Sequence, residues 1–243
     1  MEQLGSKPVS ERFTRRRIIV TAAIATAVIG GAGAIVASSI ISNHESAPRQ
    51  KETIRTPEVG EHTNITATVF WIGEPASIDN DYIHNRSSAW VEDWVSAYGG
   101  VDDPDNRCDF RPCAFTPKEN PFYFALPYND LDENGNQKAS AKQIPWYNPN
   151  APKNKSQVHD YWIEIIANDK NAYAQFGDVG PFGEDDFDYV FGSNQPTEKR
   201  AGLDLSPAAA DYLGIDGKGT VSWKFVDAAD VPDGPWKDIV NPI

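Results

Sequence analysis

The hydrophobic pattern of the chain is mostly that of short β-strands. Val221, Trp223 and Phe225 alternate with polar residues, which is typical of a strand with one buried face. Within residues 161–178, two apolar runs flank the polar sequence NDKN and predict a β-hairpin with a four-residue turn. Stretches rich in β-branched and aromatic residues predict two further strands, at 65–73 and 122–130.

Two segments carry the signals of short helices instead. The apolar residues of 90–98 would share one helical face, with Ser87 or Ser88 as the N-cap and the following glycine pair as the stop. In the sequence SPAAADYLG, Ser206 suits the N-cap, the next proline the first turn and Gly214 the end. We therefore expect a mainly β fold, and closure into a small barrel would remove exposed sheet edges.

The N-terminal region has a different pattern. Residues 18–41 carry no charge and are long enough to span a bilayer, which requires roughly 20 residues. Basic residues precede them, in the sequence RFTRRR, and such residues stay on the cytoplasmic side. We expect 1–17 to be a cytoplasmic tail, 18–41 a transmembrane signal anchor, 42–62 a polar linker and 63–243 an exported domain with a C-terminal tail. The alternative is a cleaved signal peptide, because small residues such as GGAGA offer cleavage sites.

The charge of the chain argues against a nucleic-acid-binding protein. The formal net charge is −13 and the pI is about 4.7, whereas nucleic-acid binders present a basic face. Residues 1–17 hold five of the 22 Lys and Arg residues and two of the 35 Asp and Glu residues, so the remainder has a net charge of −16. The expected exported part is therefore strongly acidic, although acidity alone identifies no partner.

The chain has two cysteines, Cys108 and Cys113, within the sequence CDFRPC. In an oxidising compartment a close pair of this kind predicts a local disulfide. A metal site would need further ligands, and the nearest histidines, His84 and His159, are distant in sequence. A redox-active pair would favour the spacing C-x-x-C. We therefore predict a structural disulfide.

Four sequences occur in an order that points to a known family: ALPYN at 125–129, DVGPF at 178–182, GLDLSPAAADYLGI at 202–215 and GTVSWKFV at 219–226. This combination resembles the double-psi β-barrel domains of the rare lipoprotein A type. Those domains are related to expansins, to barwin-like proteins and to glycoside hydrolase family 45. The resemblance covers about residues 64–227 and implies a six-stranded double-psi β-barrel with short helices.

The resemblance also implies a site. In lytic transglycosylases of this barrel type, the acid that corresponds to Asp178 protonates a glycosidic oxygen in a groove. Asp204 would either line the same groove or bond backbone amides at the start of the helix. Two positions depart from the family pattern: Val179 replaces an Arg, and Tyr123 replaces a His that titrates near neutral pH. The acidic segment 183–200 is also longer than the family's usual link, and would cover the groove, narrow it or bind a partner.

Glycosidic cleavage needs a proton donor whose pKa lies near the working pH. Packing between Phe176 and Phe182, and the charge of a nearby acid, would raise the pKa of Asp178. Lytic transglycosylation needs only this one acid, because the substrate's own hydroxyl attacks. Hydrolysis needs a second carboxylate, for which Asp130 is the best candidate.

We expect four aromatic residues to contact the substrate: Tyr123, Tyr128, Phe182 and Trp146. The sequence DLDENG at 130–135 matches the first half of a calcium-binding loop, but Ala141 stands where a bidentate Glu is needed. A turn with solvated acids fits the sequence better. We therefore predict no metal and no other cofactor.

The leading hypothesis is a single-pass protein of the cell membrane whose C-terminal domain lies outside the cytoplasm. That domain would bind cell-wall polysaccharide or peptidoglycan and cleave it as a lytic transglycosylase. The alternative is a non-catalytic, expansin-like module that binds or loosens the wall, which Tyr123 at the family's His position favours. A third hypothesis is a scaffold whose acidic segment 183–200 engages a protein partner of unknown identity.

Overall fold

The structure, a computed structural model, describes residues 59–242. The predicted basic tail, the predicted anchor at 18–41 and all but the end of the predicted linker lie outside these residues, so they stay predictions. Within residues 59–242, no helix combines the length and the apolar character needed to cross a bilayer.

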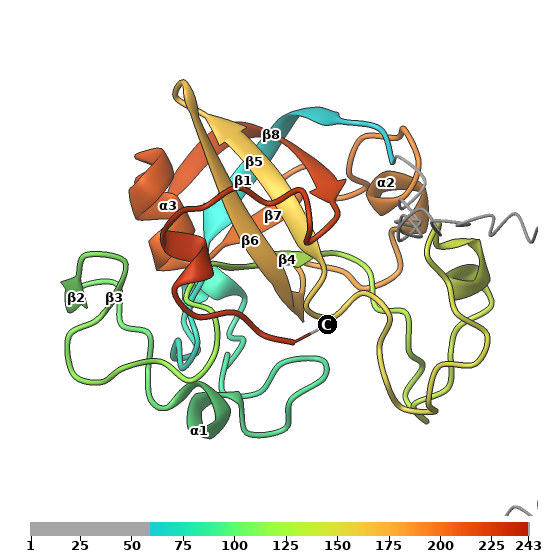
Figure 1. The fold of residues 1–243 in the computed structure, drawn as a ribbon, viewed down its shortest axis with the longest axis horizontal. Coiled ribbons are helices and arrows are strands. Elements are labelled where there is room, and N and C mark those ends of the chain that lie inside the picture. Colours follow the sequence, from blue (N-terminus) through green and yellow to red (C-terminus); the bar gives the residue numbers. More distant parts are fainter. Residues whose placement is uncertain (1–58, 243) are drawn as a thin grey trace, which may run out of the picture. The chain divides into compact units, whose positions relative to one another are not determined.

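Six strands of the described chain close into a barrel (Figure 1). The order around the barrel is β1-β7-β4-β6-β5-β8, and β8 pairs with β1 to close it. The pairs β1–β7 and β4–β6 are parallel and the other pairs are antiparallel, so the barrel is mixed. The strands are β1 (His62–Val69), β4 (Tyr123–Leu126), β5 (Trp162–Ala167), β6 (Lys170–Val179), β7 (Leu203–Leu205) and β8 (Lys218–Val226). The prediction of a mainly β fold closed into a small barrel is confirmed.

The predicted hairpin is formed by β5 and β6, but its turn is shorter than expected. Only Asn168 and Asp169 lie between the strands, and both have left-handed backbone angles, with φ of 49° and 59°. Two such residues make a type I′ turn, whose twist matches that of the flanking strands. The strands therefore extend two residues into the NDKN sequence.

The second predicted helix is confirmed in its details. Helix α3 (Pro207–Leu213) begins after Ser206, whose hydroxyl accepts a hydrogen bond from the Ala209 N–H at 3.2 Å. Gly214 ends it with φ of 72°, a left-handed conformation that glycine adopts without strain. The buried alanines of α3 pack beside β6.

The first predicted helix is shorter than expected. Helix α1 covers only Trp94–Tyr98, with Asp93 as its N-cap, although it ends at Gly99 as predicted. The Ser88 hydroxyl accepts hydrogen bonds from the N–H groups of the second and third residues after it, which folds this segment into a turn. The Ala89 N–H is directed to the side chain of Asp178 instead. These local bonds keep residues 88–91 out of the helix.

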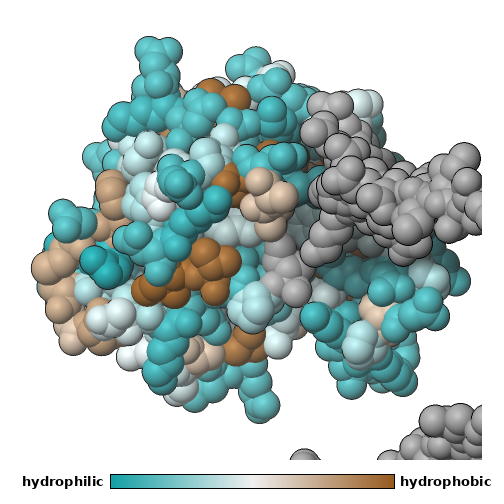
Figure 2. Space-filling view, in the orientation of Figure 1, coloured by the Kyte–Doolittle hydropathy of each residue, from teal (hydrophilic) through white to brown (hydrophobic). Residues whose placement is uncertain are grey.

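Two hydrophobic clusters lie on opposite faces of β4. Phe124 points into the barrel, where its ring stacks on Phe176 of β6 with centroids 4.8 Å apart. Tyr123 and Ala125 point outward and belong to a second cluster formed with α1 and the segment after β1. Both faces of β4 are therefore covered, and all four of its residues are buried. The face of the molecule in Figure 2 is mostly hydrophilic, in keeping with the acidic composition.

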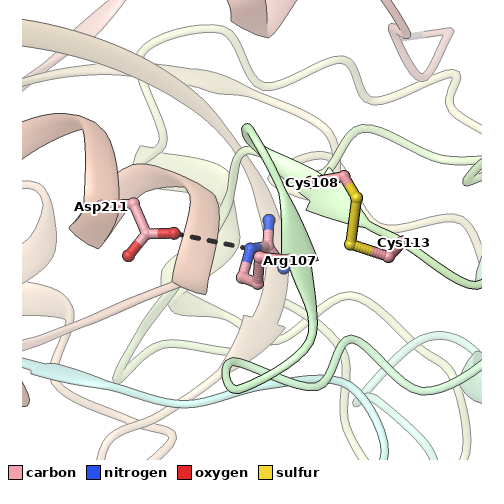
Figure 3. The surroundings of a disulfide bond; sticks show 4 residues. All are labelled: Arg107, Cys108, Cys113 and Asp211. Atoms are coloured by element: carbon pink, nitrogen blue, oxygen red, sulfur yellow. Dashed lines mark ion pairs between the residues drawn. A yellow bond between two sulfur atoms is a disulfide. The ribbon is translucent and has the colours of Figure 1, made fainter.

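The predicted disulfide between Cys108 and Cys113 is confirmed. It bridges the hairpin of two short strands, β2 (Arg107–Cys108) and β3 (Arg111–Pro112). Figure 3 shows Arg107, the first residue of this hairpin, facing Asp211 of α3. The distance between Arg107 Nε and Asp211 Oδ2 is 3.5 Å. Arg107 also pairs with the buried Asp102. Two ion pairs of Arg107 therefore join the hairpin to Asp211 of α3 and to Asp102, which lies next to the second cluster.

The remaining short elements are η1 (Ile78–Asn80), η2 (Ser140–Gln143), α2 (Phe187–Val190) and η3 (Pro235–Lys237). Helix α2 lies within the acidic segment 183–200, and this segment is anchored to the barrel. The Tyr189 hydroxyl donates to the Gly202 carbonyl at 3.0 Å and accepts from the Trp223 indole at 2.9 Å. The acidic segment is therefore part of the barrel's covering.

The C-terminal tail packs closely on the barrel. Trp236 is 3% exposed, and its ring contacts the rings of Phe122, Tyr173 and Tyr212. Asn241 accepts a hydrogen bond from the Asn120 N–H at 2.9 Å. Trp236 therefore belongs to the core.

Substitution of Trp236 by Ala is expected to lower the free energy of unfolding by about 3–5 kcal/mol, because a large buried ring is lost. Val240 is 48% exposed in the same tail, so Val240→Ala should change it by less than about 0.5 kcal/mol. Urea denaturation curves measure both values. Equal effects of the two substitutions would show that the tail does not pack as described.

Candidate functional site

Two aspartates lie in one row across neighbouring strands. Ala125 of β4 pairs with Asp178 of β6 on one side and with Asp204 of β7 on the other. Thr68 of β1 continues the row, because it pairs with Asp204. The Cα atoms of the two aspartates are thus two strand spacings apart, or about 10 Å. The structure brings together two carboxylates that are 26 positions apart in the sequence.

A β-bulge sets the direction of Asp178. Phe124 pairs with Phe176, but the next residue, Ala125, pairs with Asp178, so Gly177 is the extra residue of β6. Side chains alternate along a strand, so without the bulge Asp178 would point into the barrel as Phe176 does. The bulge puts it on the outer face with Ala125. A Cβ at Gly177 would lie 3.1 Å from the Trp94 ring, so a larger residue does not fit easily.

The outer face of this row forms the floor of a cavity of about 680 Å³, which we call the acid cavity. This volume is within the range of small-ligand sites. The walls come from three segments that are far apart in the sequence: residues 69–85, residues 178–183 and Arg200. Four acidic side chains line the cavity, from Glu74, Asp81, Asp178 and Asp204.

Asp178 is half-buried at the end of β6. Its Oδ1 accepts hydrogen bonds from the backbone N–H groups of Ala89 and Val179, at 2.8 and 2.7 Å. Burial raises the pKa of Asp178 to about 7, against the effect of these two bonds, and the charge of Asp204 raises it further. Because Oδ1 accepts from two donors, the protonated form carries its proton on Oδ2. The Asp178 carboxyl group is therefore partly protonated near neutral pH.

Asp204 lies beside it in β7 and is also half-buried. Its Oδ1 accepts a hydrogen bond from the Thr68 hydroxyl. Burial raises the pKa of Asp204 to about 7, and the charge of Glu74 contributes to this rise. The hydrogen bond from Thr68 lowers the pKa and so opposes the effect of burial. No backbone amide of the helix start is bonded to this carboxylate in the described residues, and the N-cap role belongs to Ser206. Of the two roles left open for Asp204, the structure favours the groove.

Glu74 is a third acid of the cavity, which the sequence did not indicate. Its side chain accepts a hydrogen bond from Asn85 Nδ2 at 2.8 Å, and burial raises its pKa. It reaches the cavity only because the segment after β1 folds back over the outer face of the barrel. No local sequence signal marks that return, because a contact that fixes it, from the Ile72 N–H to the Tyr123 hydroxyl, joins residues 51 positions apart.

A cation and an aromatic ring form the rim of the cavity. The guanidinium of Arg200 lies over the ring of Phe182, 3.6 Å from its centroid, and pairs with Asp81 at 2.9 Å. Phe182 is 36% exposed and has a left-handed backbone with φ of 59°, which is unusual for a bulky residue. Phe182, a predicted substrate contact, therefore lies at the rim of the acid cavity. No motif or pattern in the sequence singles out Arg200.

Three other predicted site residues lie outside the cavity lining. The Tyr123 hydroxyl is buried in the second cluster and donates to Asp102 at 2.9 Å, while it accepts from the Ile72 N–H at 3.0 Å. The Tyr128 hydroxyl is within 3.1 Å of the Ser140 hydroxyl. Trp146 lines a different hollow.

Asp130 is fully buried, away from the acid cavity. Its carboxylate accepts from the Ser156 hydroxyl at 2.6 Å and from the Gln157 N–H at 2.7 Å, so it holds the insert between β4 and β5. Asp132 accepts from the N–H groups of Asn134 and Asn136 and forms a local turn. No group of three or more His, Cys, Asp or Glu side chains within residues 59–242 is arranged to hold a metal ion.

Substitution of Asp178 or Asp204 by Asn is expected to stabilise the protein at pH 8 and to have little effect at pH 4. Folding raises each pKa from 3.8 to about 7, so it favours the protonated forms. The contribution of each raised pKa to the free energy of unfolding is fully present below pH 4 and is lost as the pH rises through 7. At pH 8 each Asn removes the cost of a buried charge, on the order of 4 kcal/mol for a pKa raised from 3.8 to about 7.

Urea denaturation at pH 4, 6 and 8 measures this dependence. The same substitution at the exposed Asp216 is the control, with a change below about 0.5 kcal/mol at each pH. A constant effect of Asp178→Asn across the three pH values would contradict the raised pKa.

Comparison with known proteins gives limited information. No family model matches the chain, and no curated protein matches it. Among solved structures, Streptomyces papain inhibitor (SPI) is similar, with a TM-score of 0.31 and 14% identity over 70% of this chain and 98% of that chain. A similarity of this degree carries no argument about activity.

Proposed function

We propose that this chain is a cell-wall glycan-directed protein with a double-psi β-barrel, in which Asp178 donates a proton to a glycosidic oxygen. The observation that carries the proposal is the row of Asp178, Ala125 and Asp204 on the floor of the acid cavity. Both carboxyl groups have a pKa near 7, so each is partly protonated at neutral pH. An acid of this kind in a cavity is what glycosidic cleavage requires.

The proposed reaction is lytic transglycosylation. Asp178 Oδ2 protonates the bridging oxygen as the bond from this oxygen to the anomeric carbon breaks. A hydroxyl oxygen of the same sugar then bonds to the anomeric carbon, and its proton passes to the Asp178 carboxylate. The products are an anhydro sugar end and a new free hydroxyl, and the acid is restored without water.

Asp204 supports two versions of this chemistry. As a neighbouring acid, its charge raises the pKa of Asp178 and keeps the proton available. As a carboxylate on the same face two strands away, it would be the group that activates water if the enzyme were a hydrolase. The product distinguishes the two, because hydrolysis leaves a reducing end where transglycosylation leaves an anhydro sugar.

Other residues of the cavity would bind the sugar. Phe182 presents an exposed ring at the rim, and Arg200 lies on one of its faces. Ala125 leaves room for a sugar between the two acids, because its side chain is a single methyl group. Outside the cytoplasm, a membrane anchor at residues 18–41 would keep this cavity close to the wall.

One observation favours a second function, that of a non-catalytic, expansin-like module that binds or loosens polysaccharide. Tyr123 stands where the related family has a His, and its hydroxyl is directed to Asp102 beneath the second cluster. No histidine of the described residues lines the acid cavity. Asp178 therefore has no imidazole partner, which the catalytic members of the family are expected to use.

The full chain, solubilised in detergent, is expected to release anhydro sugar products from purified peptidoglycan. Because the proton donor has a pKa of about 7, activity should fall as the pH rises through 7. Asp178→Asn should lower the rate by about 100-fold or more. Mass spectrometry of the soluble products gives both the rate and the type of end.

The matched control is Asp216→Asn, which removes an exposed acid outside the cavity and should leave the rate unchanged. Products that persist at the same rate in Asp178→Asn would remove the catalytic role of Asp178. Binding to insoluble glycan without any soluble product would select the expansin-like function.

A further inference from the structure

A second hollow lies on the barrel, beside the insert that joins β4 to β5. Its volume is about 390 Å³, and we call it the Trp146 hollow. Three separate parts of the chain line it: Trp90 ahead of α1, residues 146–161 of the insert and Pro242 near the C-terminal end. Hollows of this size take small molecules or one or two units of a longer ligand.

Two indole rings have fixed positions in this lining. The ring of Trp146 lies parallel to that of Tyr161, with centroids 3.8 Å apart, and its Nε1–H donates to the Gln157 carbonyl at 2.7 Å. The ring of Trp90 packs edge-on against Phe176, and its Nε1–H donates to Asn129 Oδ1 at 3.2 Å. Both indole N–H groups are therefore bonded within the protein. The Trp90 ring is also packed against His159, and the Trp146 ring against Phe191 and Phe225. What the two half-buried rings offer to a ligand is the remaining carbon surface.

The polar part of the lining carries little net charge. Lys155 and Asp160 have opposite charges, and Asp160 accepts a hydrogen bond from Asn241 Nδ2 at 2.8 Å. Burial lowers the pKa of His159, so its imidazole is neutral at pH 7. Exposed amide side chains complete the lining, from Asn148, Asn150 and Asn154. The acid cavity, in contrast, has four acids and one arginine.

A ligand that matches this lining has an apolar face for the rings, polar groups for the amides and no charge. A pyranose ring meets all three conditions, because its C–H groups form one face and its hydroxyls form the edge. A carboxylate or phosphate would have only Lys155 as a cationic partner. An aromatic peptide side chain would use the rings and leave the amides without partners.

The Trp146 hollow and the acid cavity meet at one short stretch of backbone. The Ala89 N–H donates to Asp178 of the cavity, and the next residue, Trp90, lines the hollow. Consecutive Cα atoms are about 3.8 Å apart, which is shorter than one sugar unit. A glycan chain that leaves the cavity past Ala89 would therefore run toward the residue that lines the hollow, Trp90.

We propose that the Trp146 hollow binds a neutral sugar unit of a glycan that extends from the acid cavity. The identity of the glycan rests on the proposed function, whereas the binding itself requires no catalysis. The hollow is then a second binding site that holds the chain while the acid cavity acts on it.

The test uses the full chain in a detergent without a sugar headgroup, and a tetramer of N-acetylglucosamine as the probe. Titration should shift the indole N–H signals of Trp90 and Trp146 in NMR spectra, which Trp→Phe variants assign. Ala151→Leu fills the hollow without removing any ring, and should raise the Kd by about tenfold or more. Ala139→Leu makes the same change at an exposed position of the insert outside the hollow, and should leave the Kd unchanged.

Unshifted Trp90 and Trp146 signals at saturating tetramer, or an equal Kd for Ala151→Leu and the wild type, would overturn the proposal. Asp178→Asn keeps the hollow intact and should retain the Trp90 and Trp146 shifts. If peptidoglycan cleavage is absent while these shifts remain and Ala151→Leu removes them, the enzymatic proposal fails and this one stands.

Discussion

The β-bulge at Gly177 is the constraint on which the arrangement of the site depends. It reverses the side-chain alternation of β6, so that Phe176 fills the barrel and Asp178 faces outward beside Ala125. Without the extra residue, the carboxylate would lie among the aromatic rings of the core, with no access to solvent. The barrel thus supplies the rigid row of strands, and one inserted glycine decides which face carries the acid.

The outer face alone would leave both aspartates in water with ordinary pKa values. The segment after β1 changes this, because it folds over Tyr123 and forms the walls of the cavity. Its position is held by buried polar bonds, from the Ile72 N–H to Tyr123 and from Tyr123 to Asp102. Arg107 and the disulfide hairpin support Asp102 from the other side. The raised pKa of the acids is therefore a property of this covering layer as well as of the strands.

The elements with strong local signals could be predicted from the sequence. Ser206 and Gly214 fix the ends of α3 by their own chemistry, and the alternation of Val221, Trp223 and Phe225 places β8. The start of α1 could not be predicted, because Ser88 and Asp178 compete for the N–H groups ahead of it. The Ser88 bonds are local, but the bond from the Ala89 N–H to Asp178 joins residues 89 positions apart, and no window of sequence contains both of its partners.

The site was predictable only in part for the same reason. Asp178 stood out because it ends a strand in a motif that resembles a known family, and Phe182 follows in that motif. Glu74 and Arg200 reach the cavity from loops, and their neighbours there are distant in sequence. Asp130 looked like a catalytic candidate because it follows an apolar strand, but its carboxylate holds Ser156 and Gln157 in place.

The central claim is that Asp178 carries a proton near neutral pH in a cavity open to a ligand. The most direct measurement is an NMR titration of the aspartate side-chain carboxyl carbons, with the Asp178 and Asp204 signals assigned from their Asn variants. Both signals are expected to titrate with midpoints near pH 7. A midpoint for Asp178 near 4, the value of an exposed aspartate, would contradict it.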